Sequence, residues 1–169
     1  MFHLKRILFP VDFSDRCLRA AAYAEAFAGR FDAELVLLHV IEPPTYNSTM
    51  DDLREIRPEQ IDTFFGPELK HLKTVRAIER GEAGRTIVEY ACKNNVDLIM
   101  MPTNGLGIFR RLIIGSNTAK VLHDADCPVW TGIHLENAPP LEQIRSQICS
   151  FDLRADLMPQ RHFNDFGRK

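Results

Sequence analysis

Short, mostly apolar runs recur along the chain, and segments with the apolar spacing of a helix separate them. The runs are residues 6–11 (RILFPV), 34–41 (ELVLLHVI), 74–78 (TVRAI), 96–101 (VDLIMM) and 127–133 (CPVWTGI). Runs of this kind are typical of strands that are buried on both faces of a parallel sheet. Five such strands alternating with helical segments predict an α/β fold with a doubly wound parallel sheet and right-handed crossovers.

The segments between the runs have recognisable helix boundaries. Ser14 is placed to cap a helix whose small residues recur at helical spacing as far as Gly29. Residues 84–94 have the same spacing, and Gly115 precedes a further helix. Residues 45–73 are polar and interrupted by prolines, which predicts irregular or broken helix.

The composition matches one soluble domain. A chain of 169 residues that is 45% hydrophobic and 26% charged can bury a single core. Its formal net charge of -2 creates no field that would attract a polyanion. The four cysteines are scattered, and no run of about 18 apolar residues occurs. We therefore expect a cytoplasmic protein that binds neither nucleic acid nor a membrane.

The loop after the fourth run has the composition of a phosphate site. It extends over residues 102–116, with Gly105 near its start and Gly115 and Ser116 where the next helix begins. Glycine lets the backbone approach a phosphate closely, and N–H groups at a helix start, with the hydroxyls of Ser116 and Thr118, favour an anion. Ligands of such sheets bind beyond the carboxyl ends of the strands. A tight turn alone would also require these glycines, so both interpretations stay open.

This loop and its surroundings resemble the universal stress protein family. Nucleotide-binding members have the pattern G-x2-G-x9-G-[ST]. Gly105, Gly115 and Ser116 match that pattern, whereas Pro102 replaces its first glycine. The resemblance extends over residues 4–133 and includes RILFPVDFSD, LLHVIEP and GSNTAKVLHDADCPVW. It implies a Rossmann-like sheet of the adenine nucleotide alpha hydrolase-like type, with strand order 3-2-1-4-5.

The same resemblance implies an adenine nucleotide as the ligand: ATP, ADP or AMP, with or without Mg²⁺. By position, contacts with the base and ribose fall on Pro10, Val11, Asp12, Val40, Met101 and Pro102. Contacts with the phosphates fall on Gly105, Gly115, Ser116 and Asn117. Proline has no backbone N–H, so any contact that needs this donor is lost at Pro102. Asp12 has a second interpretation, as a cap of the following helix.

The resemblance further implies a regulatory or protective nucleotide-binding module in the stress response. The residues themselves show no hydrolase motif and no metal-ligand spacing, so we expect neither catalytic residues nor a metal site. The resemblance also implies a homodimer through the last strand, residues 127–133, which begins at Cys127 and ends at Ile133. Two alternatives stay open. One is a dimeric interaction protein that no longer binds nucleotide, and the other is a weak ATPase, for which no distinct general base is visible.

The last part of the chain is expected to be an extension, residues 135–169, of a domain that covers residues 1–134. Within it, residues 148–153 (ICSFDL) can be laid over residues 8–13 (LFPVDF), with a strand-like run before an aspartate in both. This similarity indicates either the truncated start of a second repeat or a chance match over six residues.

Overall fold

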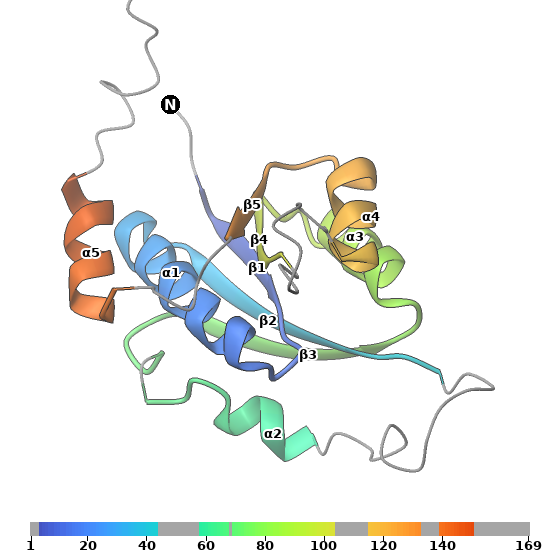
Figure 1. Ribbon diagram of the computed structural model, residues 1–169, viewed down its shortest axis with the longest axis horizontal. Helices are drawn as coiled ribbons and strands as arrows, with labels where there is room; N and C mark the ends of the chain where they lie inside the picture. The colour runs from blue at the N-terminus through green and yellow to red at the C-terminus, as the bar shows by residue number, and fades with distance from the viewer. Residues whose placement is uncertain (1–3, 44–57, 68, 104–114, 133–138, 151–169) are drawn as a thin grey trace, which may run out of the picture.

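The computed structural model describes residues 4–43, 58–67, 69–103, 115–132 and 139–150. The strands are β1 (Arg6–Pro10), β2 (Glu34–Ile41), β3 (Thr74–Arg80), β4 (Leu98–Pro102) and β5 (Val129–Gly132). The helices are α1 (Asp15–Phe31), α2 (Pro58–Thr63), α3 (Ala83–Lys93), α4 (Ser116–Asp124) and α5 (Leu141–Ser150). All strand pairs are parallel, in the order β3-β2-β1-β4-β5 (Figure 1). The predicted doubly wound sheet and its strand order are therefore confirmed.

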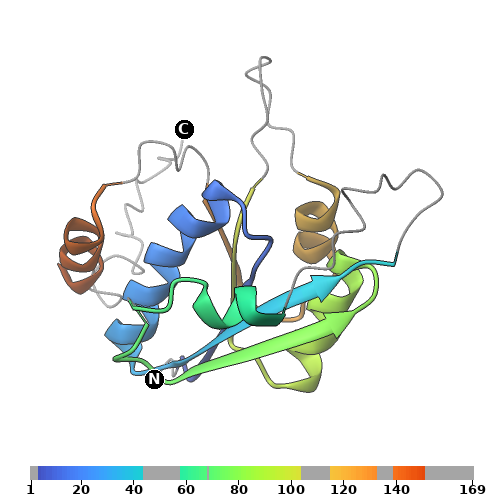
Figure 2. The ribbon, with the colours of Figure 1, turned by 90° about the horizontal axis from the view of Figure 1, so that it is seen from below.

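β1 lies at the centre of the sheet and is buried on both faces. It pairs with β2 from Arg6↔Glu34 to Pro10↔Leu38, and with β4 at Ile7↔Leu98. α1 and α2 cover one face, and α3 and α4 cover the other (Figure 2). The side chains of β1 alternate between these two cores, as the period of a strand requires. Ile7, Leu8 and Phe9 are 0% exposed.

α1 begins and ends for local reasons. The Ser14 hydroxyl accepts a hydrogen bond from the Cys17 N–H, which confirms the predicted N-cap. The helix ends at Asp32, which has a left-handed φ of 51° and whose N–H donates to the Ala28 carbonyl. Between these ends its many alanines let other elements approach closely on more than one side. Among the described residues, no helix is long and apolar enough to cross a bilayer.

The tail differs from the sequence expectation. Residues 148–150 lie in the last turn of α5, so the prediction of a strand-like run is wrong for them. A strand must pair its N–H and C=O groups with a neighbouring strand, whereas a helix pairs them within itself. The side chain of Ile144 is 1% exposed and anchors α5. Residues 151–153 and the boundary at residue 134 lie outside the described residues, so the second repeat and the domain division stay predictions.

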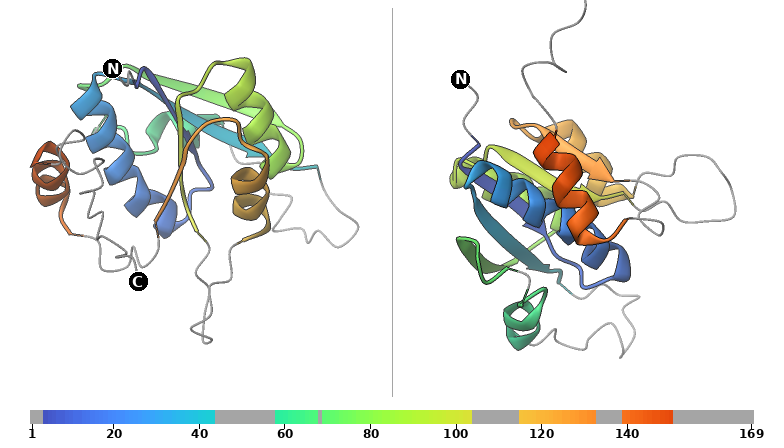
Figure 3. Two further views of the ribbon diagram at one scale, coloured as in Figure 1. Left: turned by 90° about the horizontal axis from the view of Figure 1, so that it is seen from above. Right: turned by 90° about the vertical axis from the view of Figure 1, so that its left-hand side faces the viewer.

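α5 lies across the outer side of α1 (Figure 3, right). The side chain of Glu25, in the middle of α1, is 1% exposed and faces α5. Arg145 of α5 donates to both of its carboxylate oxygens, with Nε distances of 3.0 and 3.1 Å and a further bond from Nη2. His71 adds a contact of 3.0 Å from Nε2 to Oε1. A buried carboxylate needs such partners because burial removes its hydration.

We predict that Arg145→Met releases α5 from α1. The substitution keeps an apolar stem but leaves the Glu25 carboxylate without its guanidinium partner. Breaking a buried ion pair costs about 3–5 kcal/mol, and the partial exposure of Arg145 reduces this to about 1–3 kcal/mol. Hydrogen exchange of the α5 amides should accelerate correspondingly. The double variant Glu25→Gln, Arg145→Met should recover part of the protection, and unchanged exchange in the single variant would contradict the assignment.

Candidate functional site

A cleft with a volume of about 250 Å³ opens at the carboxyl ends of β1, β2 and β4, next to the starts of α3 and α4. Among the predicted site residues it is lined by Pro10, Val11, Asp12, Val40, Met101, Pro102 and Asn117. It is also lined by Thr118, whose hydroxyl the sequence assigned to anion binding, and by residues that were not predicted: Leu38, His39, Glu42, Ala83 and Ile87. Residues that are far apart in sequence meet here because parallel strands end at the same edge of the sheet.

The remaining predicted residues belong to the loop between β4 and α4. Gly115 is the N-cap of α4 and Ser116 is its first residue, next to the lining residue Asn117. Gly105 lies outside the described residues, as do Arg110 and Arg111 in the same loop. Gly115 and Ser116 thus adjoin the cleft lining in sequence without being part of it.

Asp12 forms a tight turn between β1 and α1. Its Oδ1 accepts hydrogen bonds from the N–H (2.9 Å) and the hydroxyl (2.7 Å) of Ser14. Ser14 in turn caps α1, so Asp12 supports the helix start through Ser14. The Asp12 side chain is nevertheless exposed and lines the cleft. Its capping role and a role toward a ligand are therefore compatible.

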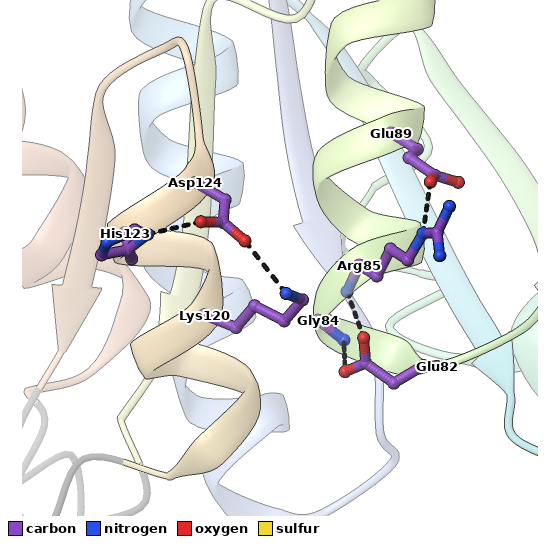
Figure 4. A network of polar contacts seen from close by, with 7 residues as sticks. All are labelled: Glu82, Gly84, Arg85, Glu89, Lys120, His123 and Asp124. Carbon is purple, nitrogen blue, oxygen red and sulfur yellow. Dashed lines mark hydrogen bonds and ion pairs between the residues drawn. The ribbon is translucent and has the colours of Figure 1, made fainter.

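The two helix starts beside the cleft differ in charge. At α3, the carboxylate of Glu82 accepts from the N–H groups of Gly84 and Arg85, both at 3.1 Å (Figure 4). The carboxylate of Glu42 accepts from the Ala83 N–H at 2.9 Å. At α4, Gly115 supplies no side-chain cap. Free N–H groups and the positive end of the helix dipole attract anions, so α4 is the more favourable of these two helix starts for a phosphate.

The charged side chains in the second half of α4 pair with one another. Asp124, in the last turn, bonds to His123 and to Lys120 (Figure 4). These hydrogen bonds hold the pKa of Asp124 below its ordinary value. Gly84 lets α3 and α4 approach closely, since a Cβ at this position would lie 3.1 Å from the Cβ and Cδ of Lys120. This packing holds the start of α3 against the middle of α4.

Thr118 lines the cleft and also contacts the backbone at the end of β4. Its side chain is 4% exposed, and its hydroxyl donates to the Pro102 carbonyl at 3.5 Å. Thr103, the residue after Pro102, donates through its hydroxyl to the Gly132 carbonyl at 3.1 Å. The two threonines thus fasten the end of β4 to α4 and β5. The expectation that the Thr118 hydroxyl faces an anion stays a prediction, since Thr118 lines the cleft while its hydroxyl is also within reach of a backbone carbonyl.

Some of the missed residues had a signal in the sequence and others had none. Leu38 and His39 precede Val40 in the same strand, and Glu42 follows its end, so they could have been included by adjacency. Ala83 and Ile87 come from α3, and only the packing of α3 on the sheet brings them to the cleft. Within the described ranges, no group of three or more His, Cys, Asp or Glu side chains is arranged to hold a metal ion.

Comparison with known proteins decides the family. The profile of the universal stress protein family matches residues 3–131. The universal stress protein in QAH/OAS sulfhydrylase 3'region of Thermus aquaticus is 32% identical over 136 residues, which cover 74% of this chain and 96% of that protein. The chain belongs to the universal stress protein family. The resemblance inferred from the sequence is therefore confirmed.

Solved universal stress proteins share the fold. UspA from Lactobacillus plantarum superposes with a TM-score of 0.59 at 26% identity, covering 78% of this chain and 99% of that one. The protein from Archaeoglobus fulgidus in complex with dAMP superposes with a TM-score of 0.56 at 21% identity, over 78% of this chain and 98% of that one. A universal stress protein in complex with cAMP has a TM-score of 0.62 at 19% identity, with the same coverage.

Cys17 lies directly behind the turn that carries Asp12. Its side chain is 0% exposed, and its thiol donates to the Pro10 carbonyl at 3.6 Å. Burial raises the pKa of the Cys17 thiol far above its ordinary value, and the Asp12 carboxylate raises it further. The folded protein therefore keeps this thiol protonated.

We predict that this thiol makes stability fall at alkaline pH. The stabilisation is fully present below the ordinary pKa of 9.0, and it is lost above that value because the unfolded thiol ionises while the folded one does not. Between about pH 9 and pH 10, the free energy of unfolding should decrease by up to about 1.4 kcal/mol more in the wild type than in Cys17→Ala. Urea unfolding at several pH values measures this difference, and parallel curves for the two proteins would contradict it.

Proposed function

We propose that this universal stress protein binds an adenine nucleotide (ATP, ADP or AMP) in the cleft and acts in the cytoplasm as a regulatory or protective module of the stress response. The observation that carries the proposal is the convergence of Asp12, Val40, Pro102 and Asn117 on one cleft beside the start of α4, where the N-cap Gly115 provides no side-chain cap. Two family structures that hold dAMP and cAMP support an adenine nucleotide as the ligand class.

The charges around the cleft favour one orientation of the nucleotide. The phosphates lie toward Gly115, Ser116 and Asn117, where helix N–H groups are available. The base and ribose lie toward β1 and β2, where Val11 and Val40 provide apolar surface. The opposite orientation would bring the phosphates next to the carboxylates that cap α3, which repel them.

Mg²⁺ is proposed as an accompanying ion rather than a resident one. Among the described lining residues the formally charged groups are Asp12 and Glu42, both of which are acidic. A divalent cation on the phosphates would offset this repulsion. ATP, with the larger charge, should therefore depend on Mg²⁺ more than AMP does.

The proposal predicts that Gly115→Val weakens ATP binding by about tenfold or more. The added side chain occupies the helix start where a phosphate would approach, and each lost charge-assisted hydrogen bond costs about 1.5–3 kcal/mol. Ser116→Ala removes only a hydroxyl and should weaken binding less. Equilibrium titration with a labelled ATP analogue measures these effects, and Glu89→Gln, an exposed change on α3, is the matched control.

Two outcomes would decide against this function. If the intact protein binds no adenine nucleotide at millimolar concentration, the cleft is not a nucleotide site and the dimeric interaction protein is favoured. If the protein releases phosphate from ATP and Gly115→Val abolishes the release, it is a weak ATPase.

A homodimer through the last strand is part of the proposal. β5 is an edge of the sheet, and its carbonyls at Pro128 and Gly132 accept from the N–H groups of Ile99 and Thr103 on the β4 side. Because these directions alternate along a strand, the N–H of Thr131 points away from β4. An edge strand of this kind can pair with a second chain. Trp130 packs on Tyr23 of α1, with ring centroids 5.3 Å apart, which keeps β5 in place.

We predict that Thr131→Pro converts the dimer into a monomer. Proline removes the outward N–H without removing a bond to β4. Thr131→Val keeps the N–H and serves as the control. Light scattering coupled to size exclusion reports the mass, and a wild-type protein that is monomeric at micromolar concentration, or a Thr131→Pro variant that stays dimeric, would rule out this interface.

A further inference from the structure

His39 makes an unusual contact at the edge of the cleft. It lies in β2, its side chain is 5% exposed, and its Nδ1 is 2.7 Å from the carbonyl oxygen of Val11. A carbonyl oxygen only accepts hydrogen bonds, so Nδ1 must carry a hydrogen. In the neutral ring Nε2 is then a bare acceptor. This Nε2 is buried and makes no hydrogen bond to the described part of the chain.

The contact fixes the first residue of the turn that leads to Asp12. The N–H of Val11 donates to the Leu38 carbonyl at 2.8 Å, and the carbonyl of Val11 accepts from His39. Both polar backbone groups of Val11 are thus held by neighbouring residues of β2. These two hydrogen bonds therefore also restrict the position of Asp12, the next residue.

The turn has a backbone conformation that needs such support. Phe13 has a φ of 60°, in the left-handed region that residues with a side chain rarely adopt. Its ring lies against His39, with centroids 4.9 Å apart, and makes an edge contact with Phe64 at 5.7 Å. Strained residues persist where the surrounding structure over-determines them. His39 therefore contacts the turn twice, through the Val11 carbonyl and through the Phe13 ring.

We infer that His39 is a positioning residue for the nucleotide cleft, which it serves by holding residues 11–14 in the geometry that presents Asp12. This inference rests on the proposed function. Packing alone would be better served by an apolar side chain, since a buried Nε2 without a partner is unfavourable. The Nδ1 donor is what an apolar side chain would lack, and a turn held in its binding geometry before the ligand arrives improves affinity.

The test compares two substitutions at this position in the full chain. His39→Asn places an amide donor close to the position of Nδ1, whereas His39→Leu fills the site without a donor. ATP affinity, measured by calorimetry, should fall about tenfold or more in His39→Leu and by less than about threefold in His39→Asn. Equal affinities of the two variants would overturn the inference, even if both were less stable than the wild type.

A second measurement does not depend on nucleotide. Nitrogen-15 spectra of the free protein should show His39 with the hydrogen on Nδ1. The Ser14 amide, which donates to Asp12 at 2.9 Å, should exchange slowly in the wild type and in His39→Asn. It should exchange faster in His39→Leu. A hydrogen on Nε2, or unchanged Ser14 exchange in a folded His39→Leu, would overturn the inference.

Together, the affinity measurement and the nucleotide-independent measurement distinguish failure of the inference from failure of the proposed function. Suppose the wild type binds no nucleotide, yet His39 carries its hydrogen on Nδ1 and Ser14 amide exchange is faster in His39→Leu. That result would refute the proposed function and the role of His39 toward a ligand, and His39 would then only support the turn. If His39→Leu does not fold, two results still test the inference. A hydrogen on Nε2 of His39, or a loss of ATP affinity in His39→Asn much larger than threefold, would overturn it.

Discussion

The burial of β1 between two neighbours is the constraint on which the rest of the structure depends. Its backbone pairs with β2 on one side and β4 on the other, and its side chains enter both cores. Parallel strands end at a common edge, so the turn after Pro10 emerges between the ends of β2 and β4. That turn carries Asp12, and the loop after β4 leads to α4. The cleft is thus a consequence of strand order before any single side chain is considered.

The starts of α3 and α4 give the two sides of the cleft different charge. Glu42 and Glu82 satisfy the first N–H groups of α3, whereas Gly115 gives α4 no side-chain cap. The first arrangement stabilises a helix and repels anions, whereas the N-cap of the second has no carboxylate to repel them. Close packing at Gly84 holds the start of α3 against the middle of α4. The contrast between the two helix starts, rather than a basic residue among the described lining, orients a phosphate in the proposed complex.

A separate interaction adds the outer layer. Glu25 would be an ordinary surface residue of α1 if α5 were absent, but Arg145 and His71 enclose its carboxylate. Ile144 supplies the apolar part of the same contact. α1 is consequently buried against the sheet on one side and against α5 on another, which its alanine-rich sequence permits without steric conflict.

The sequence by itself determined the strands and the α1 cap at Ser14, because strand burial and capping are local patterns. The family motifs are local too, and resemblance to them pointed to seven of the residues that line the cleft. Tertiary structure alone decided that Ala83 and Ile87 reach the cleft, that Thr118 bonds to Pro102, and that Glu25 pairs with Arg145. It also decided that residues 148–150 are helical, as the last turn of a helix that Ile144 and Arg145 anchor on α1. These features depend on groups that are distant in sequence, and their energies exist only when packing brings the groups within bonding distance.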